Sequence, residues 1–157
     1  MNKLLLIVVF LFLVNSSCKT QEKTLMDFLP QGYVVYKTHF GDLNKDGQED
    51  CILIIKATNK ENIVVNRFDK KVDRNRRGII VLLKKKHRYQ MVVKNDNCFY
   101  SENEDGGVYY APQLSVEIKK GDLIINYEHG RYGSWYYTFR LRNSTFELIS
   151  YDSENRY

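Results

Sequence analysis

The sequence predicts a mostly β protein: a single antiparallel β-domain of about eight strands, arranged as a meander-type sandwich or barrel, with one short helical turn at its N-terminal end. Twelve Tyr, eight Phe and one Trp occur in 157 residues, and aromatic residues are enriched in strands. No window of ten or more residues repeats its apolar side chains at the helical period. Short polar turns at Lys85–His87, Lys120–Gly121 and Asn143–Ser144 separate apolar segments, as in β-hairpins.

The first residues are typical of a bacterial export signal. Lys3 precedes an unbroken apolar run from Leu4 to Val14, which is too short to span a bilayer as a helix but suits a signal peptide. Small residues and then Cys18 follow, and this arrangement resembles a lipobox, in which the cysteine becomes the lipidated first residue. Asn15 stands where a lipobox has an aliphatic residue, so a plain secretory signal is the alternative. We expect a membrane-anchored lipoprotein of the cell envelope, or otherwise a periplasmic or secreted protein.

The chain therefore divides into a signal peptide (1–17), a tether (18–23) and one β-domain (24–157) that is long enough to bury a core. The net charge is +5, but ten Lys and Arg residues and only two acids lie from Arg67 to Arg88. A nucleic acid is not an expected partner outside the cytoplasm. The basic segment favours anionic lipid headgroups, acidic glycans or an acidic protein, and a solvated basic loop is the alternative.

The elements are expected in the following order. Thr24–Leu29 forms one helical turn, which Pro30 ends. Eight strands follow, at Tyr33–Thr38, Asp50–Ala57, Gly78–Lys84, Arg88–Lys94, Leu114–Lys119, Asp122–Glu128, Ser134–Arg142 and Thr145–Tyr151. Ile63–Val65, a β-branched run within the 58–77 connection, is a candidate for an extra short strand.

Alternation is clearest in the strand Ser134–Arg142. One set of side chains should face the core and the other should face solvent, because successive strand residues point to opposite faces. The core set is Trp135, Tyr137, Phe139 and Leu141, and the solvent set is Tyr136, Thr138, Arg140 and Arg142.

The stretch GDLNKDGQED, which runs into a β-branched strand, predicts a calcium loop. Calcium takes six to eight oxygen ligands, and alternating carboxylates and amides in a tight loop supply them. Gly47 permits the sharp turn. The expected ligands are Asp42, Asn44, Asp46, the backbone carbonyl of Gln48, and Asp50.

Two further features define this loop. An EF-hand requires Glu at position 12, where this chain has Leu53 inside a strand, so Asp50 closes the site instead. A closed loop of oxygen ligands leaves no position for chemistry, so the metal would stabilise a turn. The alternative is a polar turn held by Asx hydrogen bonds alone.

The pattern DxNxDGxxD before a β-branched run resembles the calcium loops of FG-GAP and related repeat proteins, and its first six positions resemble the start of a dockerin loop. More of the chain resembles a set of small bacterial secreted or lipid-anchored proteins of unknown function. That resemblance rests on GDLNKDGQED, RGIIVLLKK, EDGGVYYAPQLSVEIKKGDLIINY and GSWYYTFRLRNSTFELISYD. It implies calcium ligation but no activity.

If the eight strands simply go up and down, their connections alternate between two ends of the domain. The 41–49 loop and the three tight turns then share one end, and the irregular connections 58–77, 95–113 and 129–133 share the other. Loops that a rigid scaffold positions often carry function. The candidate binding face at that second end comprises Arg74, Glu102, Glu104, Asp105, His129, Arg131 and Tyr132.

Three functions fit these observations. The preferred one is a non-enzymatic, calcium-stabilised envelope module that binds an unknown protein or glycan. The alternatives are a hydrolase that uses the acidic and His-bearing loops, and a small inhibitor or protective protein against a secreted partner. Cys51 and Cys98 are expected to remain unpaired, because strand alternation places them at opposite ends.

Overall fold

The computed structural model describes residues 24–104 and 111–156. The predicted signal peptide and tether, with the lipidation site Cys18, lie outside the described residues, and so does Asp105 of the candidate binding face. Among the described residues, no helix is both long and apolar enough to cross a membrane.

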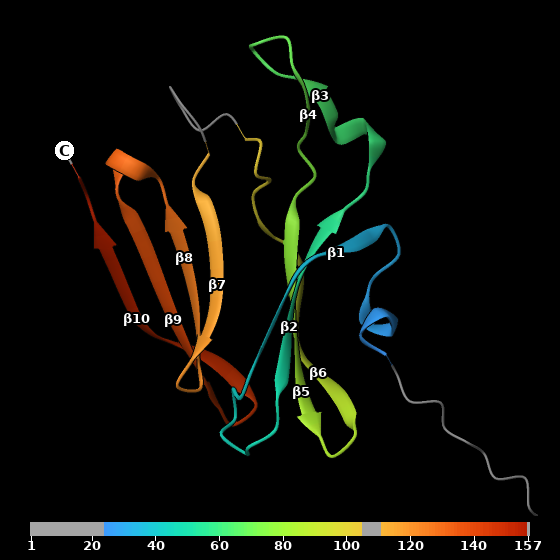
Figure 1. Cartoon of the computed structure of the whole chain (residues 1–157), viewed down its shortest axis with the longest axis vertical. Helices are drawn as coiled ribbons and strands as arrows, with labels where there is room; N and C mark the ends of the chain where they lie inside the picture. Colours follow the sequence, from blue (N-terminus) through green and yellow to red (C-terminus); the bar gives the residue numbers. More distant parts are fainter. Residues whose placement is uncertain (1–23, 105–110, 157) are drawn as a thin grey trace, which may run out of the picture.

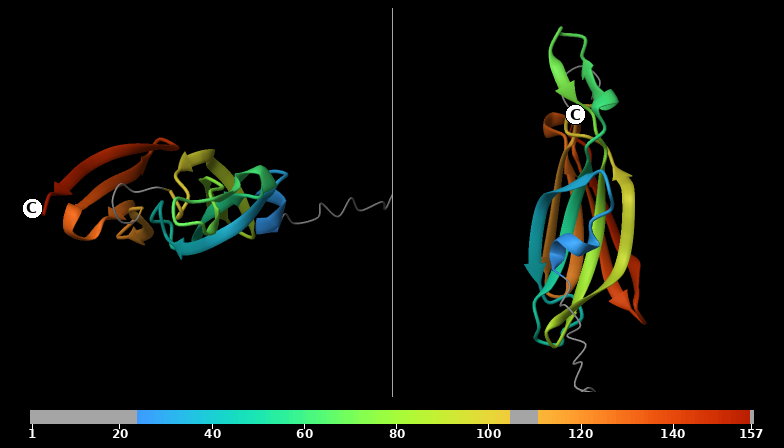
Figure 2. Two further views of the ribbon diagram at one scale, coloured as in Figure 1. Left: turned by 90° about the horizontal axis from the view of Figure 1, so that it is seen from above. Right: turned by 90° about the vertical axis from the view of Figure 1, so that its right-hand side faces the viewer.

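Two four-stranded antiparallel sheets form a sandwich (Figures 1 and 2), which confirms the predicted fold class. The first sheet has the order β1-β2-β5-β6 and the second β10-β9-β8-β7, so each is a meander of sequential neighbours. The strands of the first sheet are β1 (Tyr33–Gly41), β2 (Asp50–Ala57), β5 (Arg77–Lys85) and β6 (Arg88–Phe99). Those of the second are β7 (Gln113–Lys119), β8 (Asp122–Glu128), β9 (Ser134–Arg142) and β10 (Thr145–Glu154).

The connections fall at the two ends that strand alternation predicts. The 41–49 loop and the three tight turns gather at one end, which we call the turn end (Figure 1). The opposite loop end carries the β6–β7 connection, a 3-10 turn η3 (Gly130–Tyr132), and a separate hairpin of β3 (Ile63–Val65) and β4 (Lys71–Asp73). The short strand at Ile63–Val65 is therefore confirmed, while β4 was not expected.

The main core lies between the sheets. Ile52 and Ile54 of β2 and Ile79, Val81 and Leu83 of β5 pack there against the second sheet, whose members include Val116, Leu123 and the part-buried Phe139 and Leu141. Apolar burial of this kind is the dominant stabilising contribution to folding.

The sandwich is closed along its β1 and β7 edges. A Cβ atom built on Gly41 would lie 2.8 Å from Cγ2 of Ile118, so a side chain at Gly41 would clash with β7. This close approach brings the two edge strands into contact.

A second apolar cluster covers the outer face of the first sheet. Cys51, Leu53 and Ile55 point outward from β2, opposite to Ile52 and Ile54. Leu25, Phe28 and Leu29, in and beside the 3-10 turn η1 (Leu25–Phe28), pack on them. The predicted helical turn before Pro30 therefore exists and covers β2, which explains why residues 50–56 are buried without alternation.

Strand β6 is longer than predicted because it contains a bulge. The pairing passes from Ile79↔Asn95 to Arg77↔Phe99, so β6 carries two more residues than β5 across this interval. A Cβ atom on Gly78 would lie 2.3 Å from the Asn95 carbonyl oxygen. Only glycine allows this approach, and the bulge lets β6 continue to Phe99.

Candidate functional site

Side-chain oxygens of the predicted calcium loop converge on its own backbone. The Asp46 N–H lies 3.1 Å from Asp42 Oδ1 and 3.0 Å from Asn44 Oδ1, so these two oxygens are close together. Gly47 N–H donates to Asp42 Oδ2, and Gln48 N–H donates to Asp46 Oδ1. The backbone hydrogen bond from Gln48 and the side-chain bond from Asn44 lower the pKa of Asp46, which keeps it charged.

Asp50, the proposed closing ligand, faces the protein interior. It is fully buried, and its two oxygens accept the backbone N–H groups of Leu43 and Lys84, each at 2.8 Å. Burial raises the pKa of this carboxyl, against the lowering effect of both hydrogen bonds. Asp50 thus ties the loop to the end of β5, a role that the sequence did not indicate.

The loop also joins the two sheets. Leu43 is buried in the inter-sheet core, while Lys45, in a left-handed conformation (φ 60°), extends over Gly121 in the β7–β8 turn. Anything that rigidifies the loop therefore braces both sheets at the turn end.

The oxygen-only donor set fits calcium better than a softer metal. Asp42, Asn44 and Asp46 are gathered by their shared hydrogen bonds. Within the described residues, no three His, Cys, Asp or Glu side chains are grouped closely enough to hold a metal ion. An ion here would therefore depend on Asn44 and the Gln48 carbonyl as well as on carboxylates.

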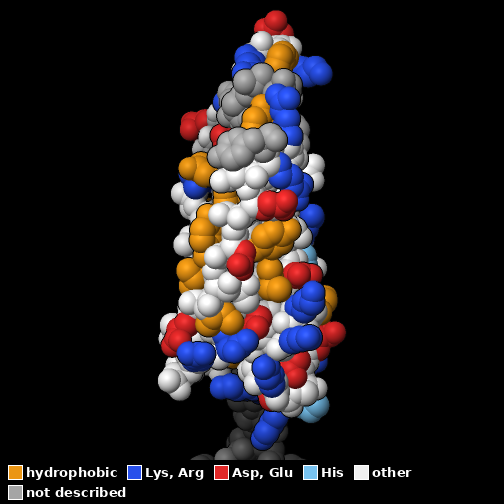
Figure 3. All heavy atoms as spheres, turned by 90° about the vertical axis from the view of Figure 1, so that its left-hand side faces the viewer, with side chains coloured by type: hydrophobic (Ala, Val, Ile, Leu, Met, Phe, Trp, Pro, Cys, Tyr) orange, Lys and Arg blue, Asp and Glu red, His pale blue; other side chains and the backbone are white. Residues whose placement is uncertain are grey.

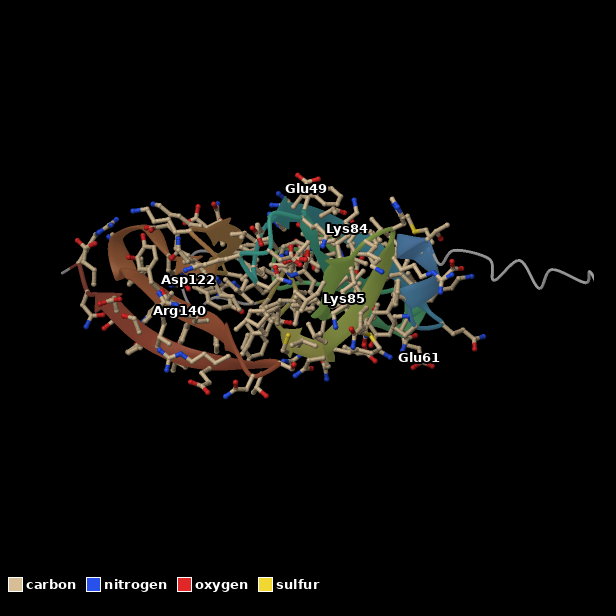
Figure 4. The ribbon with its side chains drawn as sticks, turned by 90° about the horizontal axis from the view of Figure 1, so that it is seen from below. Glu49, Glu61, Lys84, Lys85, Asp122 and Arg140 are labelled. Carbon is tan, nitrogen blue, oxygen red and sulfur yellow. The ribbon has the colours of Figure 1, made fainter. Side chains whose placement is uncertain are left out.

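Beside the loop, Asp122 and Arg140 form a two-pronged ion pair on the outer surface of the second sheet. The distances are 2.7 Å from Nε to Oδ1 and 2.8 Å from Nη2 to Oδ2, and the two side chains point toward each other in Figure 4. The hydrogen bond from Arg140 lowers the pKa of Asp122.

At the loop end, a polar network orders the long connections. Lys56 at the end of β2 is nearly buried, and its Nζ lies 2.6 Å from Glu102 Oε1 and 2.9 Å from Asp73 Oδ2. Burial opposes the charge of Lys56, but hydrogen bonds to Glu102 and Asp73 outweigh it and raise the pKa of the amine. Arg77 donates from Nε to the Tyr100 carbonyl.

Asn75 holds the base of the β3–β4 hairpin through its amide. Its Oδ1 accepts from Asn59 N–H and Asn62 Nδ2, and its Nδ2 donates to the Asn59 carbonyl and to Asp73 Oδ1. The side chain is almost completely buried, so every polar atom of this amide is used where water is scarce.

The candidate binding-face residues belong to the segments that meet at the loop end. Glu104 accepts from Ser101 Oγ at 3.1 Å, and Arg74 donates its N–H to the Asn62 carbonyl. In and beside η3, the His129 ring packs on Tyr132 and on Trp135, with centroids 4.9 and 6.5 Å away. Arg131 donates to the Tyr132 hydroxyl. Glu102 belongs to the Lys56 network described above.

A groove lies between the sheets on their β6 and β10 side. It consists of two adjoining cavities of about 560 and 540 Å³ that share Cys98, Tyr127 and Tyr137. We call this feature the inter-sheet groove. Figure 3 shows the face of the second sheet, with hydrophobic side chains in its middle and charged ones crowded at its lower end.

The walls of the inter-sheet groove change along its length. The cavity nearer the turn end is lined by aliphatic and Phe side chains, including Val93, Leu123, Phe139 and Phe146. The cavity at the loop end is aromatic with a few polar groups, and its lining includes Arg77, Tyr100, Ser101, Glu104, Trp135 and Tyr151. Trp135 and Tyr137, predicted as core, therefore line the groove. Phe139 and Leu141 pack on the core as predicted, although Phe139 also lines the groove.

Neither described cysteine is an activated nucleophile. Cys51 and Cys98 are both free thiols. Burial raises the pKa of Cys51 to about 12 and that of Cys98, among the groove walls, to about 11. A reactive cysteine instead needs a lowered pKa.

Sequence reasoning missed Lys56, Asn75 and Asp50 as organising residues. Their roles depend on strand pairing that brings distant segments together, although a lysine within the apolar run CILIIKA was a usable signal. No protein-family model, no curated protein and no solved structure matches the chain.

Proposed function

We propose that the protein is a non-enzymatic binding module of the cell envelope, stabilised by calcium in the Asp42–Asp50 loop and anchored to the membrane through Cys18. The inter-sheet groove is the observation that carries the binding function. Binding sites are typically concave and mostly apolar, with a few polar groups that orient the ligand. The groove has this composition, and Arg77, Ser101 and Glu104 are its polar groups at the loop end.

The ligand is a protein segment or glycan with an elongated apolar or ring-bearing surface. Tyr and Trp rings provide broad apolar surfaces with polar tips, and five such residues lie at the loop-end cavity: Tyr100, Tyr127, Trp135, Tyr137 and Tyr151. His129 and Tyr132 extend this aromatic surface through their contacts with Trp135 and each other.

The hydrolase alternative has weaker support. Glu102 is paired with Lys56, Glu104 accepts from Ser101, and the His129 ring is packed between aromatic rings. These contacts hold the groups in structural roles. The raised pKa values of both described thiols also argue against a cysteine nucleophile.

The single tryptophan of the chain, Trp135, lines the groove and provides the test. Chitin tetrasaccharide and an extended apolar hexapeptide are titrated separately while the tryptophan emission is followed. We expect one probe to shift the emission saturably, and Tyr137→Ala to abolish the shift. The control is Tyr136→Ala, because this neighbour is exposed on the other face of β9.

A shift that survives Tyr137→Ala, or emission that is indifferent to both probes, contradicts groove binding. The anchor is tested separately, since Cys18→Ala should move the protein from the membrane fraction to the soluble fraction. Unchanged fractionation contradicts the lipoprotein proposal without affecting the groove.

A further inference from the structure

The β3–β4 hairpin projects beyond the sandwich at the loop end (Figures 1 and 2). Its two strands pair only with each other, in the register Ile63↔Asp73 to Val65↔Lys71, and belong to neither main sheet. An isolated two-stranded hairpin is marginally stable, so the Asn75 amide and the Arg74–Asn62 backbone bond that hold its base are needed to keep it in place.

The tip of this hairpin, residues 65–71, is a well-formed turn built on Asn66. Its Oδ1 accepts the N–H groups of Phe68 and Lys70, at 2.9 and 3.0 Å. Its backbone N–H donates to the Lys70 carbonyl, and its carbonyl accepts from Asp69. The tip is thus preorganised, and a preorganised segment loses less conformational entropy on docking.

The tip combines exposed apolar side chains with basic ones. Val65 and Phe68 are 67 % and 61 % exposed, and three exposed cations, Arg67, Lys70 and Lys71, accompany the single acid Asp69. The Arg67 guanidinium lies 4.9 Å from the centre of the Phe68 ring. In Figure 3 an acidic group caps this extremity, and hydrophobic and basic side chains lie together just below it.

From these contacts we propose that the hairpin tip docks on an anionic lipid surface. The excess of positive charge complements anionic headgroups, which attract clusters of Lys and Arg. Phe68 and Val65 supply apolar groups that enter the interfacial layer, where hydrophobic and aromatic side chains anchor peripheral proteins. A projecting convex tip suits a deformable bilayer, whereas an acidic protein would need a matching pocket for the Phe68 ring.

The test uses the full chain reconstituted with vesicles whose acyl chains carry bromine, which quenches nearby tryptophan. Phe68→Trp reports the tip. Phe40→Trp is the matched control, since Phe40 is 49 % exposed near the end of β1 at the turn end. The parent chain gives the Trp135 background, and the N-terminal segment is common to all variants.

With phosphatidylcholine vesicles containing one-third phosphatidylglycerol, we expect at least threefold stronger quenching for Phe68→Trp than for Phe40→Trp. Pure phosphatidylcholine and high salt should reduce this excess, because surface charge is screened. Adding Lys70→Glu with Lys71→Glu should abolish it, while Lys85→Glu with Lys86→Glu at the turn end should not.

Equal quenching of both reporters, or equal quenching on neutral and anionic vesicles, overturns the proposal. Absence of quenching on anionic vesicles also overturns it and leaves an acidic protein as the partner whose charge fits the tip.

Discussion

Asp50 accepts the backbone N–H of Lys84 at 2.8 Å, although the two residues are 34 positions apart in the chain. The other carboxylate oxygen of Asp50 accepts the Leu43 N–H. One buried side chain therefore fastens the loop between β1 and β2 to the far end of β5.

Removing this carboxylate should destabilise the fold whether or not a metal is bound. Asp50→Ala leaves two backbone donors without their acceptor, so we expect the free energy of unfolding to fall by about 2–4 kcal/mol. Asp50→Asn keeps one acceptor oxygen, so its free energy of unfolding should fall by less than that of Asp50→Ala. Urea unfolding in chelator measures both, with Asp152→Ala as a control, because Asp152 is exposed and bonds to Ser150. Equal stability of Asp50→Ala and this control would contradict the assigned role.

Calcium should raise the melting temperature, and magnesium should do so poorly because it demands a tighter octahedral shell. With a Kd of about 10⁻⁴ to 10⁻³ M, calcium at ten times Kd stabilises the fold by about 1.4 kcal/mol, or about 3–8 °C in Tm. Melting curves with calcium, magnesium or chelator measure this response. Asp46→Ala should remove it, and it should melt close to the chelated wild type.

The matched control for this experiment is Glu49→Ala, which deletes an acid of the same loop that lies outside the ligand set. It should retain the calcium response. Melting of the wild type that is indifferent to millimolar calcium would refute the metal assignment.

Gly78→Ala should destabilise the protein more than Gly32→Ala. A Cβ atom at Gly78 would lie within 2.7 Å of backbone atoms of Asn95 and Asp96, which cannot move aside as a side chain can. We expect a loss of about 3 kcal/mol. Gly32 has open space around it but a φ of 79°, so alanine there should cost about 1 kcal/mol from backbone strain alone. Denaturant midpoints compare the two, and similar losses would mean that the bulge rearranges freely.

The Asp122–Arg140 pair should stabilise the protein in a pH-dependent way. The folded-state pKa of Asp122 is lowered from its ordinary value of 3.8, so the folded protein binds fewer protons than the unfolded chain as the pH falls through this range. The stabilising contribution of the pair is therefore fully present above the unfolded-state pKa. It is lost as the pH falls through the folded-state pKa. The difference in stability between wild type and Asp122→Asn should therefore be greatest near neutral pH and disappear on acidification below pH 4.

Unfolding curves from pH 7 to 2.5 measure this difference. Glu147→Gln is the control, since its partner Arg142 is 3.3 Å away and both side chains are about half exposed. If the stability difference between wild type and Asp122→Asn is constant with pH, the charge of Asp122 does not contribute the stability assigned to it.

Strand positions were predictable because local signals agreed with the fold. Thr145 and Arg142 flank a two-residue turn in which Asn143 and Ser144 both have positive φ, as two-residue hairpins require. The run Ile52–Ile55 reads as a strand whichever face is buried. The placement of the connections at alternate ends of the domain followed from the order of these strands alone.

The groove could not be predicted, because it depends on long-range pairing. Cys98 lines it only because β6 bulges opposite Gly78, and nothing near Cys98 in the sequence encodes that register. The burial of Leu43 could not be predicted for a similar reason. Its neighbours Asp42 and Asn44 indicated a polar loop, yet packing against the second sheet buries its side chain.

The dependence of the hairpin on Asn75 has a consequence for how the molecule opens. No residue of β3 or β4 belongs to either apolar cluster of the described chain. The exchange of their amide hydrogens with solvent should therefore proceed through a local fluctuation that leaves the sandwich intact. Amides of Val64 and Val72 would then be protected far less than those of Ile54 and Ile80, whose exchange requires the whole domain to unfold. The protein would behave as two cooperative units of unequal stability, coupled by the buried Asn75 amide and by the ion pair of Lys56 with Asp73.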